Sequence, residues 1–215
     1  MATWTATTLD WRFGSIVAPG FRYTFDGRDA MWLARALAGE STVQAAGLDG
    51  TGVFWAMVNR MAIQAGRPLA RRGFDALPWP WRFADLLRAY CQPINPYWAD
   101  RGDRWQIERR RRIASMTPDE AGTELVNFVW KLTTGRGPSS GRFTGIVDFG
   151  APSCSECYSY HGPHEFCVLN CFWKIDGTRG WPEGTVRIAQ PGTPVLLPLA
   201  FGAAAVAVAL AFRGR

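Results

Sequence analysis

The stretch WLARALAGES, Trp32 to Ser41, reads as an amphipathic helix that ends on a glutamate. Its apolar residues follow the i, i+3, i+4, i+7 spacing of one helix face: Ala30, Leu33, Ala34 and Leu37. Glu40 comes three residues after Leu37 and therefore falls on the same inward face. A carboxylate at the C-terminal end of a helix opposes the helix dipole by up to about 1 kcal/mol. Glu40 therefore either lies in solvent or faces the core side for a chemical reason.

Helical patterns continue along much of the chain, and we expect a mainly α fold. Asp26 or Asp29 can cap the helix that leads to Glu40, and the small residues of Ser41 to Gly52 predict a loop. Further helices are expected at Val53 to Ile63, in Trp81 to Tyr90, from Arg104 to about Met116, and from Pro118 to Gly135, the last opened by a capping box at Thr117 and Glu120.

The chain after Gly135 has a different character. VDFGAP, which ends at Pro152, predicts a short extended piece, and VLNCFW and TVRIAQ could be short strands separated by a turn at Asp176-Gly177. The region between is rich in cysteine. It predicts a small appendage rather than a continuation of the helical part.

Length and composition indicate a folded protein with at least one real core. The chain has 215 residues, 47% of them hydrophobic, with eleven tryptophans, which excludes an intrinsically disordered class. The formal net charge is +6, which favours anionic partners: nucleic acid, an anionic membrane surface or a bacterial cell wall. Composition alone does not choose among these three.

The C-terminal segment has no charged residue over residues 194–212 and is closed by Arg213 and Arg215. That length suffices for one membrane-spanning helix, and the alternative is a buried helix. The first residues lack a basic region followed by an unbroken apolar run, so we expect no secretory signal there. We therefore expect four parts: an N-terminal arm (1–25), a helical domain (26–152), a cysteine-rich appendage (153–192) and a C-terminal membrane anchor (193–215).

The cysteine cluster allows two kinds of chemistry. Cys154, Cys157, Cys167 and Cys171 could supply four thiolates to zinc, with His161 and His164 as further ligands, or they could form one or two disulfides. Four cysteines allow three pairings, among which the sequence does not choose. Cys91, at the end of a predicted helix, is expected to be a buried free thiol.

The basic run from Glu108 to Arg112 raises the question of nucleic-acid binding. Its four consecutive arginines would spread around a helix instead of forming one stripe, so we interpret the run as a solvated helix face and expect no nucleic-acid partner. A zinc-containing nucleic-acid binder remains an alternative, which would need zinc at the cysteine cluster beside a contiguous basic face.

Four stretches in this order, LARALAGES, GVFWAMVNR, LLRAYCQPINPYW and VDFGAP, resemble the SleB/CwlJ-type cell wall hydrolases, including forms found in phages. Together they span roughly Asp29 to Pro152, and a fainter similarity continues in NCFW from Asn170. The resemblance implies a small helical, lysozyme-like domain that cleaves peptidoglycan glycan strands. It also implies that Glu40 is the catalytic acid. The cysteine-rich segment and the apolar tail depart from the family pattern.

The resemblance and the residues together predict a peptidoglycan lytic transglycosylase. A simple hydrolase needs a second carboxylate, for which Asp49 and Asp148 are candidates, but the position of neither marks it clearly for this role. A transglycosylase manages with Glu40 alone, whereas a muramidase would use one of these two. We expect the sugar chain to contact polar and aromatic residues near the acid: Ser41, Tyr90, Gln92, Asn95, Tyr97 and Trp98. Asn59 and Arg60 are expected to support the fold by hydrogen bonding.

The setting expected for such an enzyme is the cell-wall side of a membrane. Because that compartment is oxidising in most Gram-negative hosts, disulfides are favoured over zinc, and no cofactor is expected. The apolar tail and the resemblance to phage forms predict a virion-associated protein anchored in a membrane through residues 194–212, with peptidoglycan and other virion proteins as partners. The alternative from another class is a non-catalytic, membrane-anchored structural protein with a degenerate hydrolase fold.

Overall fold

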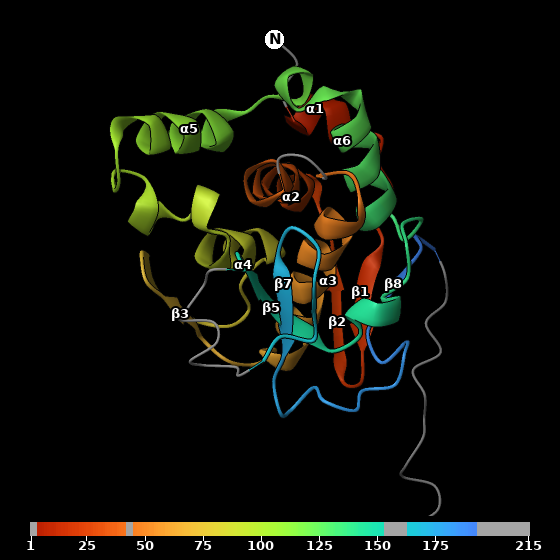
Figure 1. Cartoon of the computed structure of the whole chain (residues 1–215). Helices are drawn as coiled ribbons and strands as arrows, with labels where there is room; N and C mark the ends of the chain where they lie inside the picture. The colour runs from red at the N-terminus through yellow and green to blue at the C-terminus, as the bar shows by residue number, and fades with distance from the viewer. Residues whose placement is uncertain (1–3, 42–44, 153–162, 193–215) are drawn as a thin grey trace, which may run out of the picture.

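The computed structural model describes residues 4–41, 45–152 and 163–192, and Figure 1 shows the arrangement of their helices and strands. The helices are α1 (Trp4–Thr8), α2 (Gly27–Glu40), α3 (Leu48–Ile63), α4 (Phe83–Tyr90), α5 (Arg104–Ser115) and α6 (Pro118–Thr133), with short 3-10 helices η1 (Gln92–Ile94), η2 (Pro96–Trp98) and η3 (Gly141–Phe143). The strands are β1 (Ser15–Ala18), β2 (Phe21–Thr24), β3 (Leu69–Arg71), β4 (Phe74–Leu77), β5 (Ile146–Gly150), β6 (Phe166–Cys167), β7 (Cys171–Lys174) and β8 (Arg187–Ala189).

Helix α2 begins and ends as its sequence predicts. Asp26 is the N-cap, and its side chain accepts a hydrogen bond from the backbone of Asp29, whose own carboxylate accepts one from the backbone of Asp26. The predicted apolar face is fully buried at Leu33 and Leu37. The helix ends at Glu40, and Ser41 closes it by donating its backbone N–H to Leu37.

Helix α3 is the buried helix of the core, as its uniformly apolar sequence predicts. It begins at Leu48, five residues before the expected start at Val53, so the predicted loop up to Gly52 is wrong over its second half. The early start depends on tertiary packing: Gly52 lies directly against the rings of Phe143 and Phe172 and leaves no room for a Cβ. Asp49, in the first turn, is completely buried.

The prediction of a mainly α, lysozyme-like fold is wrong, because the described residues form a mixed α/β structure with three small sheets. One sheet has the order β2-β1-β8, another the order β5-β7-β6, and β3 and β4 form a hairpin. All pairs are antiparallel. The strands have two to five residues each, which is too short to give a clear alternating pattern in the sequence.

Two sheets join segments that are far apart in the chain. β1, in the expected N-terminal arm, pairs with β8, in the expected appendage, with Ile16 opposite Ile188. β5 pairs with β7 and also packs along α3, which lies behind both strands in Figure 1. These pairings attach the region after residue 163 to the helical core.

The predicted membrane anchor is corrected by the structure. In residues 4–41, 45–152 and 163–192, no helix combines the length and the apolar character needed to cross a bilayer. The two longest, α3 and α6, have 16 residues each, whereas a span takes about 20. The predicted transmembrane helix and membrane-anchored location are therefore not retained. Residues 194–212, on which both predictions rested, lie outside the described residues.

Candidate active site

Glu40 is the last residue of α2, and its side chain is half-buried. Burial raises the pKa of its carboxyl from 4.5 to about 8. The negative charges of Asp49 and Asp148 act in the same direction, while a hydrogen bond from the backbone N–H of Gln92 and the guanidinium of Arg109 lower the pKa. At neutral pH the group is therefore mostly a neutral carboxylic acid that can donate a proton.

Asp49 holds the end of α2 in place. Its buried carboxylate accepts hydrogen bonds from the hydroxyl of Ser41, the backbone N–H of Leu169 (3.2 Å) and both the backbone N–H and the side-chain amide of Asn170 (2.8 Å each). The same amide also donates to the backbone carbonyl of Glu40 (3.2 Å). We call Ser41, Asp49, Leu169 and Asn170 the Asp49 clamp. Both oxygens of Asp49 and the Ser41 hydroxyl are thus engaged within the protein.

Asp148 lies on β5 and forms an ion pair with Arg60 of α3, with 2.9 Å between the charged atoms. Arg60 also donates to the carbonyl of Val147 (2.6 Å), and Asn59 donates to the carbonyls of Phe143 and Ile146. Asn59 and Arg60 therefore support the fold by hydrogen bonding, as predicted. Because the carboxylate of Asp148 is neutralised by Arg60, it is less suited to act as a free base.

Tyr90, the last residue of α4, contacts two arginines and a glutamine. The guanidinium of Arg60 lies 4.1 Å from the centre of the Tyr90 ring, and that of Arg71 lies 4.7 Å from it. The Tyr90 hydroxyl accepts a hydrogen bond from Gln64 (2.9 Å). Cys91 is a buried free thiol, as predicted, and burial raises its pKa. Gln92 is exposed beside these residues.

The other three predicted sugar contacts lie in the segment after η1. Asn95 is buried, and its side-chain amide donates to the carbonyls of Ala89 (2.7 Å) and Arg72 (3.2 Å), while its oxygen caps η2 at Tyr97. This amide is used within the fold. Tyr97 and Trp98 are partly exposed and contact each other edge to face, with ring centres 4.9 Å apart.

Two residues near Glu40 were not singled out from the sequence. Arg109 of α5 donates to the carbonyl of Gly39 (2.9 Å) and holds α5 against the end of α2. Asn170 is the central donor of the Asp49 clamp. The faint family similarity at NCFW was the only sequence signal for Asn170, and within the basic run nothing distinguished Arg109 from its neighbours.

Two cavities of about 210 and 440 Å³ are both lined in part by the loop at 138–140. Trp55, Leu132 and Ile188 contribute to the smaller cavity, and Leu48, Phe128 and Phe143 to the larger. Neither of these two cavities includes Glu40. The candidate active site is therefore defined by its side-chain contacts and not by these cavities.

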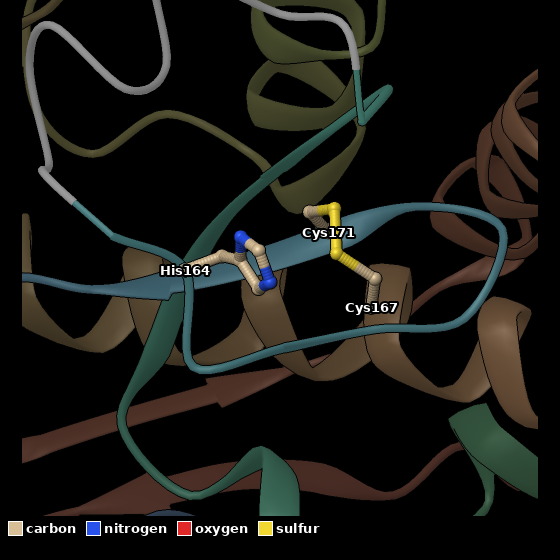
Figure 2. A group of neighbouring side chains, drawn as sticks. All are labelled: His164, Cys167 and Cys171. Atoms are coloured by element: carbon tan, nitrogen blue, oxygen red, sulfur yellow. A yellow bond between two sulfur atoms is a disulfide. The ribbon is translucent and has the colours of Figure 1, made fainter.

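The cysteine cluster is described in part. Cys167 and Cys171 form a disulfide across the β6–β7 hairpin, and His164 lies beside them (Figure 2). The ligand atoms of these three residues all lie within 4.8 Å of one another, so the group could hold a metal ion if the cysteines were reduced. Cys154, Cys157 and His161 lie outside the described residues.

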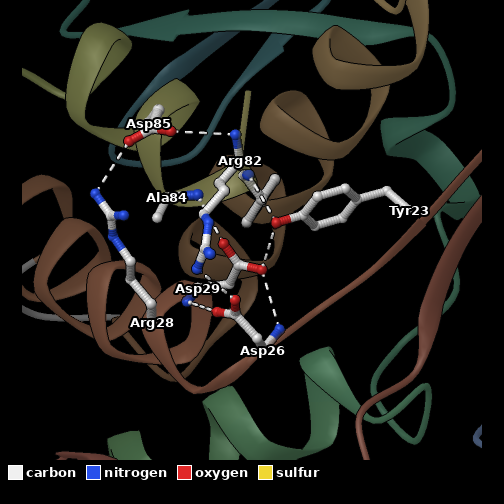
Figure 3. A network of polar contacts seen from close by, with 8 residues as sticks. Tyr23, Asp26, Arg28, Asp29, Arg82, Ala84 and Asp85 are labelled. Carbon is white, nitrogen blue, oxygen red and sulfur yellow. Dashed lines mark hydrogen bonds and ion pairs between the residues drawn. The ribbon is translucent and has the colours of Figure 1, made fainter. Parts of the chain in front are cut away.

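A second buried carboxyl, Asp29, belongs to a polar network that joins β2, α2 and α4 (Figure 3). It accepts hydrogen bonds from the Tyr23 hydroxyl (2.8 Å) and from the backbone N–H groups of Asp26 (3.0 Å) and Ala84 (2.8 Å). Burial raises its pKa to about 7 against these donors. Because both of its oxygens accept hydrogen bonds within the fold, we assign Asp29 a structural role.

Comparison with protein-family models, curated proteins and solved structures finds no match for this chain. The fold and the site therefore define a mixed α/β protein in which a glutamic acid at the end of a helix has a raised pKa. The resemblance to the SleB/CwlJ-type hydrolases stays a prediction from four short stretches of sequence.

Proposed function

We propose that the protein cleaves the β-1,4 glycosidic bond between MurNAc and GlcNAc in peptidoglycan, with Glu40 as general acid and then general base. The observation that carries the proposal is the raised pKa of Glu40, about 8, at the end of α2. An acid in this state can protonate the leaving oxygen at neutral pH. The family resemblance supplies the substrate class.

Lytic transglycosylation suits this site better than hydrolysis with two carboxylates. Asp49 is bonded to four donors, and Asp148 is paired with Arg60, so neither supports a free second carboxylate. In the proposed reaction Glu40 gives its proton to the glycosidic oxygen as the bond from the MurNAc anomeric carbon breaks. The 6-hydroxyl of the same MurNAc then attacks that carbon and returns its proton to Glu40, which leaves a 1,6-anhydro ring and a neutral acid.

Aromatic side chains near the acid supply surfaces for sugar rings. Trp105 of α5 is 69% exposed, and the guanidinium of Arg109 lies 6.0 Å from its ring centre. Arg109 in turn bonds the carbonyl of Gly39, next to Glu40. Trp105 therefore joins Tyr90, Tyr97 and Trp98 as a proposed sugar contact.

The cysteine hairpin has a positioning role in this proposal. Leu169 and Asn170 lie inside the loop that the Cys167–Cys171 disulfide closes, and both donate to Asp49. We infer that the disulfide limits the conformations of this loop and so strengthens its hold on the end of α2. The alternative is that the same two cysteines bind zinc, which requires them to be reduced because a disulfide has no thiolate for a metal.

The test is digestion of purified peptidoglycan sacculi by the full chain at pH 6 to 9, with the products identified by mass spectrometry. We expect anhydro-muropeptides from the parent and at least about a hundred-fold less product from Glu40→Gln, since an essential acid typically contributes 10²–10⁴-fold. Activity should fall above pH about 8, as Glu40 loses its proton. Glu108→Gln, which changes an exposed glutamate of α5, is the matched control and should retain activity.

Three results would contradict parts of this proposal. Reducing-end products that require Asp148 would identify a muramidase. Equal activity of Glu40→Gln and the parent would place the catalytic group elsewhere. A folded but inactive parent would favour the alternative, a non-catalytic structural protein.

A further inference from the structure

We propose that the β6–β7 hairpin is a redox-gated site for a thiophilic divalent ion of the Zn²⁺ class, with His164, Cys167 and Cys171 as its three ligands. The ligand atoms of these residues already lie within 4.8 Å of one another, and Figure 2 shows the imidazole beside the disulfide over β7. Two thiolates and one imidazole are ligands that zinc prefers, and three protein ligands leave one tetrahedral position open.

The hairpin keeps the three ligands together without the disulfide. Cys167 and Cys171 are directly opposed in the β6–β7 pair. Backbone hydrogen bonds from Val168 to Asn170 and from Glu165 to Phe172, both 2.8 Å, close the hairpin on either side of this pair. Breaking the sulfur–sulfur bond therefore leaves two thiols next to each other on a loop that is still held in place.

Contacts with the core add to this preorganisation. Phe166 and Phe172 pack against each other across the hairpin, with ring centres 5.2 Å apart and the ring planes tilted by 30°. At the loop tip, Leu169 and Asn170 are bonded to buried Asp49. A ligand set that does not need to be assembled loses less conformational entropy when the ion binds.

The disulfide and the metal exclude each other, because a metal ligand must be a thiolate. An external dithiol opens the site: its two electrons and two protons pass to Cys167 and Cys171, which become thiols, while the dithiol becomes a disulfide. The ion then binds to both sulfurs and to a ring nitrogen of His164, and two thiol protons are released to solvent. Oxidation by a disulfide reagent reverses both steps and expels the ion.

The site also connects to the proposed active site. The loop closed by Cys167 and Cys171 carries the Asn170 amide, which bonds both Asp49 and the carbonyl of Glu40. Opening or closing the disulfide therefore changes the constraint on Asn170, which helps to fix the end of α2. The metal site itself does not depend on the proposed activity.

The test is a titration of the full chain with Co²⁺ alone, a spectroscopic substitute for Zn²⁺, in an oxygen-free buffer. The chain is first reduced with a water-soluble phosphine, which takes its oxygen from water as it is oxidised. We expect one ion per chain, with thiolate-to-cobalt absorption in the near ultraviolet and intense visible bands of a tetrahedral centre. Added Zn²⁺ should bleach both, and the oxidised chain should show neither.

Variants assign the bands to these residues. A chain with Cys91→Ala, Cys154→Ser and Cys157→Ser keeps only the hairpin cysteines, and we expect it to bind Co²⁺ with unchanged spectra. His164→Ala alters an exposed residue and should weaken binding of the ion by about ten-fold or more. Even the loss of a residue that only hydrogen-bonds a metal ligand lowers metal affinity by about that factor. His161→Ala is its matched control and should bind as the parent does.

The proposal is overturned by any of three results. These are the absence of thiolate bands in the reduced parent, the loss of binding in the chain that keeps only Cys167 and Cys171, and unchanged affinity of His164→Ala. None of these measurements involves peptidoglycan, so their failure would leave the proposed function untouched.

Discussion

Replacing Glu40 by glutamine should stabilise the folded protein at alkaline pH. A carboxyl whose pKa is raised from 4.5 to about 8 is harder to ionise in the folded chain than in the unfolded chain. At about 1.4 kcal/mol per pKa unit, the upper bound on the cost of ionising it is about 5 kcal/mol. The side chain is half-buried, so solvent screening lowers the expected gain to about 2 to 4 kcal/mol.

The pH window follows from the direction of the shift. Below pH 4.5 the group is protonated in both states, and Glu40→Gln should have nearly the stability of the parent. Between pH 4.5 and about 8 the folded state holds more protons than the unfolded state, so the parent loses stability as the pH rises. The glutamine variant lacks this loss. The difference between the two proteins should therefore grow across this window and level off above pH 8.

Urea denaturation of both proteins at half-unit steps from pH 4 to 9.5 measures this difference. Glu108→Gln, at an exposed carboxylate, is the control and should follow the parent at every pH. Stability curves of Glu40→Gln and the parent that run parallel over the whole range would refute the reasoning. The pKa of Glu40 would then not be raised, and the proposal that Glu40 donates a proton at neutral pH would no longer be supported.

Three further changes test other parts of the structure by the same urea denaturation. Asp29→Asn should destabilise by about 1 to 3 kcal/mol near pH 4, because its amide N–H₂ must face one of three donors, and it should lack the loss of stability that the parent shows between pH 3.8 and about 7, so the deficit of the variant should shrink as the pH rises; a deficit that stays constant from pH 4 to 7 would contradict the raised pKa of Asp29. Gly52→Ala should cost about 1 to 3 kcal/mol despite alanine's better helix propensity, because its Cβ would lie 2.4 Å from the ring of Phe172; a neutral effect would mean that α3 and β7 are less closely packed. Asn170→Ala should cost about 1 to 3 kcal/mol because it leaves buried Asp49 with fewer donors, whereas Asn127→Ala, at an exposed residue, should not lower stability. If the two variants were equally stable, the Asp49 clamp would contribute nothing to stability.

Helix α2 shows which features a local pattern can predict. The caps at Asp26 and Asp29, the buried face and the position of Glu40 all depend on residues within a few positions of one another. The capping box of Thr117 and Glu120 is confirmed for the same reason. The start of α3 was missed, because a glycine-rich stretch forms helix there only when packed against the rings of Phe143 and Phe172.

The three-sheet architecture could not be predicted in this way. β8 lies within TVRIAQ, which was predicted as a strand, but β1 is too short to show a period, and the two strands that pair are separated by most of the chain. The hairpin of β3 and β4 was missed for the first reason alone, since its residues read only as a break between helices.

For the candidate site, the sequence by itself determined that a carboxyl group stands at the end of an amphipathic helix, because helical periodicity and capping are local. Only the tertiary structure decided the surroundings of that carboxyl group and hence its pKa. Asn170 meets Asp49 from 121 positions away, and Arg109 reaches Gly39 from 70 positions away. The raised pKa of Glu40 arises from burial by these distant segments, because desolvation depends on what surrounds a group in space and not on its neighbours along the chain.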